Sequence, residues 1–343
     1  MTTSSTVDPR QFVRYSGPDP RNPRSLIDAE FAQGAVPDWL HTKDIQEANP
    51  GPYARDAEGR FADTASVDPA PKVPGIISLM RQMGVPTVTD RSVHNVPAID
   101  MTDLVKSSGT LTGGANGTYF IEYDDNGQIQ KSVFKPVLEE NPRVHPAYIG
   151  RQSIAEVSAF IVSESMGLDL AARTRHVVIG EKRGSLADFV NDTAVRADET
   201  LLSDRRNASG IASMLYFDAL IGNSDRHLGN WLIRDGEVKP IDNGMSFARN
   251  SDYQSGKLKF RGFEHDPTVR QTQPMPAEFA KGLDQLVANQ QKINVRLKNA
   301  GLEDANRDSF WKRVDYLRKT KQLDFNEMTL KDIARLAEGL DLT

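Results

Sequence analysis

The chain of 343 residues is 38% hydrophobic and 26% charged, a balance typical of a soluble globular protein with one large domain or two ordinary ones. Its net charge of -5 argues against a general nucleic-acid-binding protein, because neutralising phosphates requires clustered Lys and Arg. The lack of Cys excludes disulfide scaffolds, thiolate metal sites and Cys nucleophiles.

The start of the chain has no signal-peptide pattern, and no apolar run approaches the ~18 residues of a membrane span. We therefore expect a cytoplasmic protein without a transmembrane segment. Residues 1–72 are rich in Pro, Asp, Ser and Arg, so they are predicted to be mostly irregular. Within them, Arg55–Ala62 resembles a short tag of phage-head-related proteins, although a surface turn in a linker accounts for it too. A short amphipathic helix is predicted at Ile76–Met83.

A β-hairpin is predicted next. The segment Thr118–Tyr123 alternates in polarity and carries β-branched and aromatic residues, and Gln128–Lys135 has the composition of a returning strand. Between them, Asp124–Gly127 contains the dipeptide Asn-Gly, which suits a type I′ turn because both central residues of that turn need positive φ.

The remaining elements follow from hydrophobic periodicity and from Gly at their ends. We predict a helix at Ser153–Gly167, a strand at Arg175–Ile179, a helix at Ala208–Ile221 and a hairpin at Trp231–Ile241. Three helical segments follow, near residues 276–299, 304–319 and 329–340. A β-rich part thus precedes a helical part, which indicates an α+β protein with two lobes, the first at 73–182 and the second at 183–343.

A Gly-rich turn lies just before the first predicted strand, within Gly109–Tyr119. Glycines let a backbone approach a phosphate closely, and their N–H groups can cradle its oxygens. The alternative is a β-turn that binds no ligand. The candidate phosphate-binding residues of this turn are Gly113, Gly114, Asn116, Gly117 and Thr118.

Two charged residues of the first lobe are candidates for an ion pair. Lys135 lies among apolar residues at the end of the hairpin, and a Lys directed inward requires a partner because an isolated buried ammonium is costly. Glu156 lies at the border of the apolar face of the following helix, where it can turn towards Lys135. The alternatives are a Lys that reaches solvent and a solvated Glu.

The most specific pattern is Asp225-Arg-His-Leu-Gly-Asn230, followed by a hairpin and then by Asp242-Asn-Gly244. Asp225 can accept a proton from a hydroxyl, while Asn230 and Asp242 offer the hard oxygen ligands that Mg²⁺ prefers. Antiparallel pairing of the hairpin returns Asp242 beside the end that carries Asn230. The sequence therefore predicts a metal site next to Asp225, a carboxylate that can act as a general base.

These segments resemble the phosphoinositide-kinase-like superfamily, which includes phosphatidylinositol kinases, actin–fragmin kinase and the Hip-type bacterial Ser/Thr kinases. The resemblance covers roughly residues 105–260. It is carried by the following stretches: Asn116–Phe120, Val133–Pro136 with Glu139 and Glu140, Ala155–Val157, Gly184–Val190 (similar to the segment after the hinge), Phe217–Trp231 and Ile241–Phe247.

The resemblance implies a two-lobed protein-kinase-like fold, with a β-rich N-lobe and a helical C-lobe, and the cofactors ATP and Mg²⁺ or Mn²⁺. It implies that Lys135 binds nucleotide phosphates and that Glu156 positions it. Asp225 becomes the catalytic carboxylate, and Asn230 and Asp242 become the metal ligands.

The same resemblance bears on three neighbouring positions. Arg226 and His227 complete the D-R-H triplet and are candidate catalytic residues, and the alternative for His227 is a structural His bonded to a nearby carbonyl. Asn243 replaces the Phe of the D-F-G pattern, so regulation by Phe movement is not expected.

The acceptor is open between a protein Ser/Thr, including the chain itself, and a phosphoinositide. The loop after Asp242 carries four basic residues, which suits an anionic headgroup, but Ser246–Lys257 is also polar and long enough to receive a peptide. The net negative charge and the lack of a strong amphipathic anchor favour protein. A nucleotide-binding protein that is no kinase, or one that transfers AMP, is the third alternative.

Overall fold

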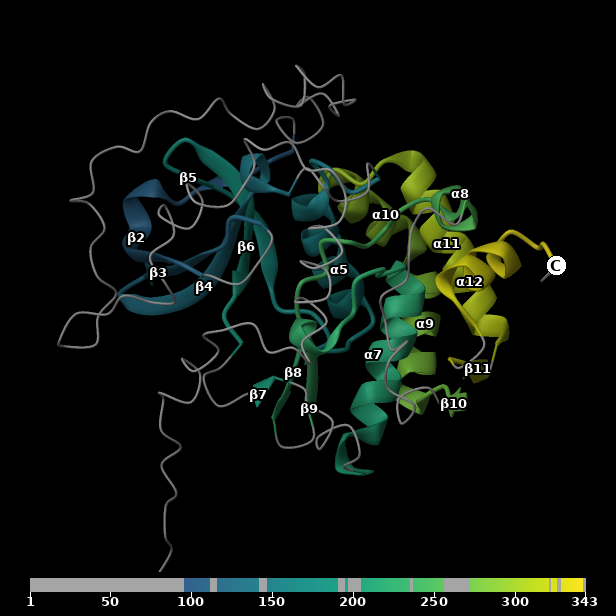
Figure 1. Ribbon diagram of the computed structural model, residues 1–343. Helices are drawn as coiled ribbons and strands as arrows, with labels where there is room; N and C mark the ends of the chain where they lie inside the picture. The colour runs from purple at the N-terminus through teal and green to yellow at the C-terminus, as the bar shows by residue number, and fades with distance from the viewer. Residues whose placement is uncertain are drawn as a thin grey trace, which may run out of the picture.

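The computed structural model describes residues 96–111, 116–141, 147–190, 195–196, 205–234, 237–255, 272–320, 322–325 and 328–341. The predictions for residues 1–72 and for the helix Ile76–Met83 lie outside these ranges. The described part consists of a strand-rich lobe joined to a helical lobe (Figure 1). The predicted α+β fold with a strand-rich and a helical lobe is confirmed for these residues.

The first lobe is built on a six-stranded sheet with the order β1-β5-β6-β4-β3-β2. Neighbouring strands are antiparallel except β1, which runs parallel to β5. The strands are β1 Ile99–Asp100, β2 Val105–Thr110, β3 Tyr119–Asp125, β4 Gln128–Pro136, β5 Thr174–Ile179 and β6 Lys182–Asp188. One face of this sheet is covered by its own apolar cluster, formed by Met101, Ile121, Tyr123, Phe134, Val177 and Leu186.

The β3–β4 hairpin confirms the predicted turn. Asn126 and Gly127 have φ values of 55° and 86°, as a type I′ turn requires. The carboxylate of Asp124 accepts the N–H of Gly127 at 2.6 Å, which closes the turn. The register set by this turn places Lys135 near the end of β4.

Strand β6 lies inside this sheet, between β4 and β5. The expected lobe boundary at residue 183 therefore divides a strand of the first lobe. The segment Gly184–Val190, which resembles the stretch after a kinase hinge, begins within β6. Gly184 allows β6 to approach β4, because a Cβ there would lie 2.2 Å from the carbonyl oxygen of Lys135.

Helix α5, Gln152–Ser165, connects the two lobes. Most of its residues are buried, and its apolar side chains belong to the same core cluster as those of the helices in the second lobe. It also lies beside the sheet (Figure 1). Gly167, with φ 68°, ends this region close to the predicted position. A helix covered on both sides is buried nearly all round, which explains why its apolar face is broad.

The second lobe begins with α7, Ala208–Ile221, the helix that the sequence predicts. Ten of its residues are buried, so it is a core helix rather than a surface one. Gly222 follows in the left-handed conformation, with φ 67°, and ends the helix. The polar loop that carries Asp225 starts directly after it.

A three-stranded sheet with the order β7-β8-β9 follows the loop. Its strands are β7 Val195–Arg196, β8 Trp231–Arg234 and β9 Glu237–Pro240. The pairing Trp231↔Pro240 confirms the predicted hairpin, whose turn residues 235–236 lie outside the described ranges. The hairpin brings the chain back to the loop at Asp242.

Five helices and two short strands complete the second lobe within the described ranges. The predicted helical segment near residues 276–299 is confirmed, and it consists of two helices. They are divided at Asn289, whose side chain donates to the carbonyl of Gln285 at 2.9 Å and competes with the helix. These elements are α8 Asn250–Gln254, β10 Thr272–Pro274, α9 Ala277–Ala288, α10 Gln290–Asn299, α11 Asp304–Lys319, β11 Gln322–Asp324 and α12 Leu330–Ala337. None of the described helices is long and apolar enough to cross a lipid bilayer.

Candidate active site

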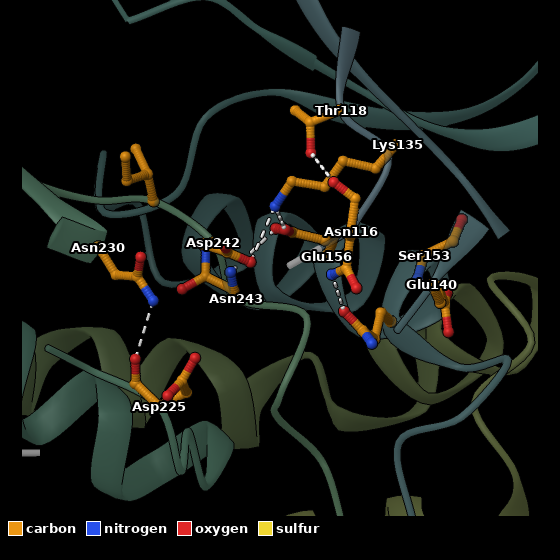
Figure 2. Close-up of polar contacts among 12 residues, drawn as sticks. Asn116, Thr118, Lys135, Glu140, Ser153, Glu156, Asp225, Asn230, Asp242 and Asn243 are labelled. Carbon is orange, nitrogen blue, oxygen red and sulfur yellow. Dashed lines mark hydrogen bonds and ion pairs between the residues drawn. The ribbon is translucent and has the colours of Figure 1, made fainter. Parts of the chain in front are cut away.

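Lys135, Glu156 and Asp242 meet between the sheet, α5 and the segment after β9 (Figure 2). The Nζ of Lys135 donates to Glu156 Oε1 at 2.6 Å and to Asp242 Oδ1 at 2.9 Å. The side chain of Glu156 is 7% exposed, whereas that of Asp242 is 39% exposed. The predicted pairing of Lys135 with Glu156 is confirmed, and Asp242 joins the pair from the second lobe.

The charges in this cluster stabilise one another. Burial alone would lower the pKa of Lys135, but the carboxylates of Asp242 and Glu156 outweigh burial and raise that pKa. Burial would raise the pKa of Asp242, but the charge of nearby Lys135, and to a smaller extent that of Arg226, holds it below its ordinary value. An ammonium and a carboxylate therefore face each other at neutral pH.

The backbone around Asp225 is held by the loop itself. Its N–H donates to the Oδ1 of Asn223 at 3.0 Å, and its carbonyl accepts the side-chain amide of Asn230 at 2.9 Å. The same carbonyl accepts the N–H of His227 at 3.0 Å. The carboxylate of Asp225 is 23% exposed, so it remains accessible to a substrate.

Asn230 and Asp242 lie at the same end of the β8–β9 hairpin, as the sequence predicts. The N–H of Ile241 donates to the carbonyl of Asn230 at 2.9 Å, which ties the two ends together. Because the Nδ2 of Asn230 is bonded to Asp225, its Oδ1 is the atom left to act as a ligand.

This donor set suits a hard cation such as Mg²⁺, which takes few protein oxygens and completes its shell with phosphate and water. Within the described ranges no group of three or more His, Cys, Asp or Glu side chains could hold a metal ion by itself. An amide oxygen and an ionised carboxylate therefore fit a metal that arrives with a nucleotide.

His227 lies beside Asp225 with a defined orientation. Its Nδ1 accepts the N–H of Gly229 at 3.0 Å, so the proton of the neutral ring is on Nε2. The Nε2 is 4.0 Å from Asp225 Oδ2. The Nε2 side of the ring therefore faces Asp225, and the catalytic role of His227 stays a prediction.

Arg226 has a different position from the one predicted. Its side chain is 0% exposed, and it forms two parallel bonds with the carboxylate of Asp218, at 2.9 and 3.0 Å. A group so enclosed does not touch a substrate. The prediction that Arg226 is catalytic is therefore wrong, because burial and pairing make it a residue that holds the loop in place.

The Gly-rich turn is described only from Asn116 onward, so the candidates Gly113 and Gly114 lie outside the described residues. The N–H of Gly117 donates to the carbonyl of Glu139 at 3.0 Å and is not available to a phosphate. A Cβ on Gly117 would lie 2.0 Å from Glu139 Oε2. Gly117 therefore serves packing, contrary to its predicted role in cradling phosphate.

Asn116 and Thr118 also bond within the protein. The Asn116 amide donates to Gln152 Oε1 at 2.7 Å and accepts the N–H of Asn141 at 2.6 Å, and the Thr118 hydroxyl donates to the Asn116 carbonyl at 3.3 Å (Figure 2). Gln152 in turn packs on Gly244, where a Cβ would lie 3.0 Å from it. Asn116 thus connects the Gly-rich turn to the start of α5.

Sequence reasoning missed three residues that support the site. Asp218 holds Arg226, and a lone carboxylate within the apolar helix α7 was a usable signal for a buried partner. Gln152 had no such signal. Glu140 accepts the N–H groups of Gly150 and Ser153, at 2.7 and 3.4 Å, in front of α5. Burial raises the pKa of Glu140 to about 8, against these backbone bonds, which lower it.

The basic loop after Asp242 is described in part. Arg249 forms an ion pair with Asp252 at 3.0 Å, so one of its four cations has a local partner. The other three, Lys257, Lys259 and Arg261, lie outside the described residues.

The family model for phosphatidylinositol 3- and 4-kinase matches residues 154–324. Among solved structures, the Helicobacter pylori proinflammatory kinase CtkA matches at 18% identity with a TM-score of 0.42, over 72% of this chain and 100% of that chain. The Golgi casein kinase with Mn/ADP bound matches at 12% identity with a TM-score of 0.43, over 96% and 93%. Both TM-scores are below 0.5, so these two likenesses carry no weight beside the family match. No curated protein matches the sequence.

Proposed function

This chain belongs to the phosphatidylinositol 3- and 4-kinase-like superfamily and is a kinase, and we propose that it transfers the γ-phosphoryl group of ATP to a protein Ser or Thr hydroxyl. The observation that carries the proposal is the contact of Lys135 with Glu156 and Asp242 at 2.6 and 2.9 Å. It joins a phosphate-binding cation of the first lobe to a metal ligand of the second, as phosphoryl transfer requires.

Each residue then has a defined task. Lys135 binds the nucleotide phosphates, and Glu156 keeps its ammonium pointed at them. Asn230 and Asp242 would hold Mg²⁺, or Mn²⁺ in its place, and the metal would supply positive charge that offsets the charge of the phosphates. Gly113 and Gly114 remain predicted contacts of the phosphates.

Asp225 orients the acceptor hydroxyl and accepts its proton. Its backbone is fixed by Asn223 and Asn230, so the carboxylate points from a rigid loop, which favours a productive approach of the hydroxyl. His227, with its Nε2 proton facing Asp225 at 4.0 Å, helps to stabilise the negative charge on this side.

A protein acceptor is favoured over a lipid for two reasons. Asp252, which pairs with Arg249, lowers the net positive charge that this loop presents to an anionic headgroup. The net charge of -5 also opposes binding to an anionic membrane. The family match itself includes lipid kinases, so a phosphoinositide acceptor is the competing outcome of the test.

The test uses ATP carrying a radiolabelled γ-phosphate, with Mg²⁺, in three parallel reactions: the chain alone, the chain with a protein lysate, and the chain with phosphatidylcholine vesicles that contain phosphoinositides. Label on Ser or Thr is the expected result, and Asp225→Asn abolishes it. Label in the extracted lipid overturns the protein acceptor. Parallel reactions with label in the α-phosphate detect AMP transfer, which would overturn phosphoryl transfer.

A further inference from the structure

The residue after Asp242 is Asn243, where the D-F-G pattern has an apolar Phe. Asn243 is 3% exposed, so its amide is buried beside the candidate metal ligand. A buried amide requires hydrogen-bond partners. These partners show what replaces the apolar Phe.

Arg226 supplies the partner of the Asn243 side chain. Two of its five N–H groups go to Asp218, and its Nη1 donates to the carbonyls of Asn230 and Ile241. The fifth N–H, from Nη2, goes to Asn243 Oδ1 at 2.6 Å. Every donor of this buried guanidinium is therefore used, and Asn243 is the acceptor that completes the set.

The backbone of Asn243 is held from the opposite side. Its N–H donates to Glu156 Oε2 at 3.1 Å, while the other oxygen of Glu156 binds Lys135. The segment after β9 is thus anchored by its main chain to α5 and by the Asn243 side chain to the catalytic loop.

Asp242 needs such anchoring because of its own backbone. Its φ is 58°, in the left-handed region that residues other than Gly seldom adopt, although Asp tolerates it better than most. A conformation of this kind persists only where the neighbouring contacts hold it. The anchor at the next residue therefore decides where the Asp242 carboxylate lies.

We infer that Asn243 is a positioning residue, which holds the Asp242 carboxylate ready for Mg²⁺ and ATP by accepting the fifth N–H of Arg226. The inference rests on the proposed function, since Asp242 is the expected metal ligand there. If Asn243 swung outward, Arg226 would keep a buried N–H without an acceptor. The segment is therefore held by this bond, whereas a Phe at this position would offer Arg226 no acceptor.

The test compares two substitutions. Asn243→Leu keeps the approximate size and removes the acceptor, and Asn243→Asp keeps an acceptor oxygen. ATP binding is measured by calorimetry at increasing Mg²⁺ concentrations. Asn243→Leu is expected to raise the Mg²⁺ concentration for half-maximal binding by about tenfold, as loss of a residue that supports a metal ligand does elsewhere. Asn243→Asp is expected to stay at or below the wild-type concentration.

The matched control is Asn306→Leu, on α11. Asn306 is also a buried Asn, 2% exposed, that accepts from an arginine, Arg151, at 3.1 Å. It is expected to lower thermal stability without changing the Mg²⁺ concentration. The inference is overturned if Asn243→Leu shifts that concentration no more than Asn306→Leu.

The two proposals fail in different ways. A wild-type chain that binds no ATP in the presence of Mg²⁺ overturns the proposed function and this inference together. Binding by wild type with unchanged Mg²⁺ dependence in Asn243→Leu overturns the inference alone. If Asn243→Leu does not fold, Asn243→Ser, whose hydroxyl is shorter, is judged by the same criterion.

Discussion

Lys135 in the first lobe and Arg226 in the second are two cations of the same candidate site, held in different surroundings. The side chain of Lys135 is 20% exposed, and one of its two carboxylate partners, Asp242, reaches solvent. Arg226 is 0% exposed, and its carboxylate partner, Asp218, is 2% exposed. A partly exposed ion pair contributes little to stability and can exchange partners with a phosphate, whereas a buried one is costly to break. The first lobe thus offers a binding group, and the second a fixed support.

A second buried arginine extends the comparison. Arg313 on α11 donates to the carbonyl of Leu220 at 2.9 Å and to Asn250 Oδ1 at 2.7 Å, and it lies over the ring of Tyr253. Burial lowers the pKa of Arg313. Arg313 donates to the carbonyls of Leu220 and Ile221 at the C-terminal end of α7, which is the negative end of the helix dipole. Arg226, by contrast, pairs with the full charge of Asp218. The helix and its following loop are therefore supported by two buried cations of different kinds.

The largest effect is expected on breaking the buried pair. Arg226→Leu should lower the free energy of unfolding by about 3–5 kcal/mol, because Asp218 is left as an uncompensated buried charge. Urea denaturation measures the loss.

Two further variants test the cause. Arg313→Leu should lose less, about 1–3 kcal/mol, because only dipoles lose their partner. Arg226→Leu combined with Asp218→Leu should regain part of the stability. Equal losses for the two arginines, or no recovery in the double variant, would contradict the distinction between a charge and a dipole partner.

The second prediction concerns Lys135, whose contacts with Glu156 and Asp242 are partly exposed. Lys135→Met should lower kcat/KM by about 100-fold or more, because a cation that faces the transferring phosphate is lost. The free energy of unfolding should fall by less than in Arg226→Leu, because Glu156 still accepts the N–H of Asn243 and Asp242 reaches solvent. Steady-state kinetics and urea denaturation of the same preparation measure both.

Lys182→Met is the matched control for this experiment. Lys182 also pairs with a glutamate, Glu139, at 2.7 Å, but it is 49% exposed and is the first residue of β6. It should change neither quantity appreciably. A large stability loss in Lys135→Met would show that the first lobe, too, uses its cation as support.

The third prediction depends on pH and concerns His176, which joins the lobes. Its ring meets the Ser153 hydroxyl at 3.2 Å and the Ala300 carbonyl at 3.0 Å. Burial lowers the pKa of His176 to about 4, so the folded ring is neutral. The contribution of His176 is fully present above about pH 6.5 and falls by about 3 kcal/mol as the pH drops to 4.

The measurement is the difference in unfolding free energy between wild type and His176→Leu at several pH values. Glu140 has the opposite dependence, since its raised pKa makes its contribution fall as the pH rises towards 8. Both chains keep Glu140, so the subtraction removes it. A difference that does not change between pH 7 and pH 4 would contradict a neutral buried ring.

Much of the fold follows from local patterns. The Asn-Gly turn, the helix Ala208–Ile221 and the hairpin that returns Asp242 depend on neighbouring residues, and each lies where the sequence predicts. The break at Asn289 and the short pair β10–β11 were missed, because one side-chain bond and two three-residue strands leave little trace in hydrophobic periodicity.

The site divides in the same way. The residue types and their order point to Lys135, Glu156, Asp225, Asn230 and Asp242 without any coordinates. The residues that hold them in place do not follow from the sequence. From the sequence, Arg226 is predicted to be catalytic because it belongs to the D-R-H triplet. Its true partners come from α7, from the end of β9 and from Asn243.

The amino-acid sequence by itself determined which chemical groups are available and, through turns and helices, the order in which they arrive. Only the tertiary structure decided which of those groups face a substrate and which are enclosed. Burial is set by the packing of segments far apart in the chain, as when α7, the catalytic loop and Asn243 enclose Arg226. The same D-R-H triplet therefore contains an accessible carboxylate, a partly exposed ring and a fully buried guanidinium.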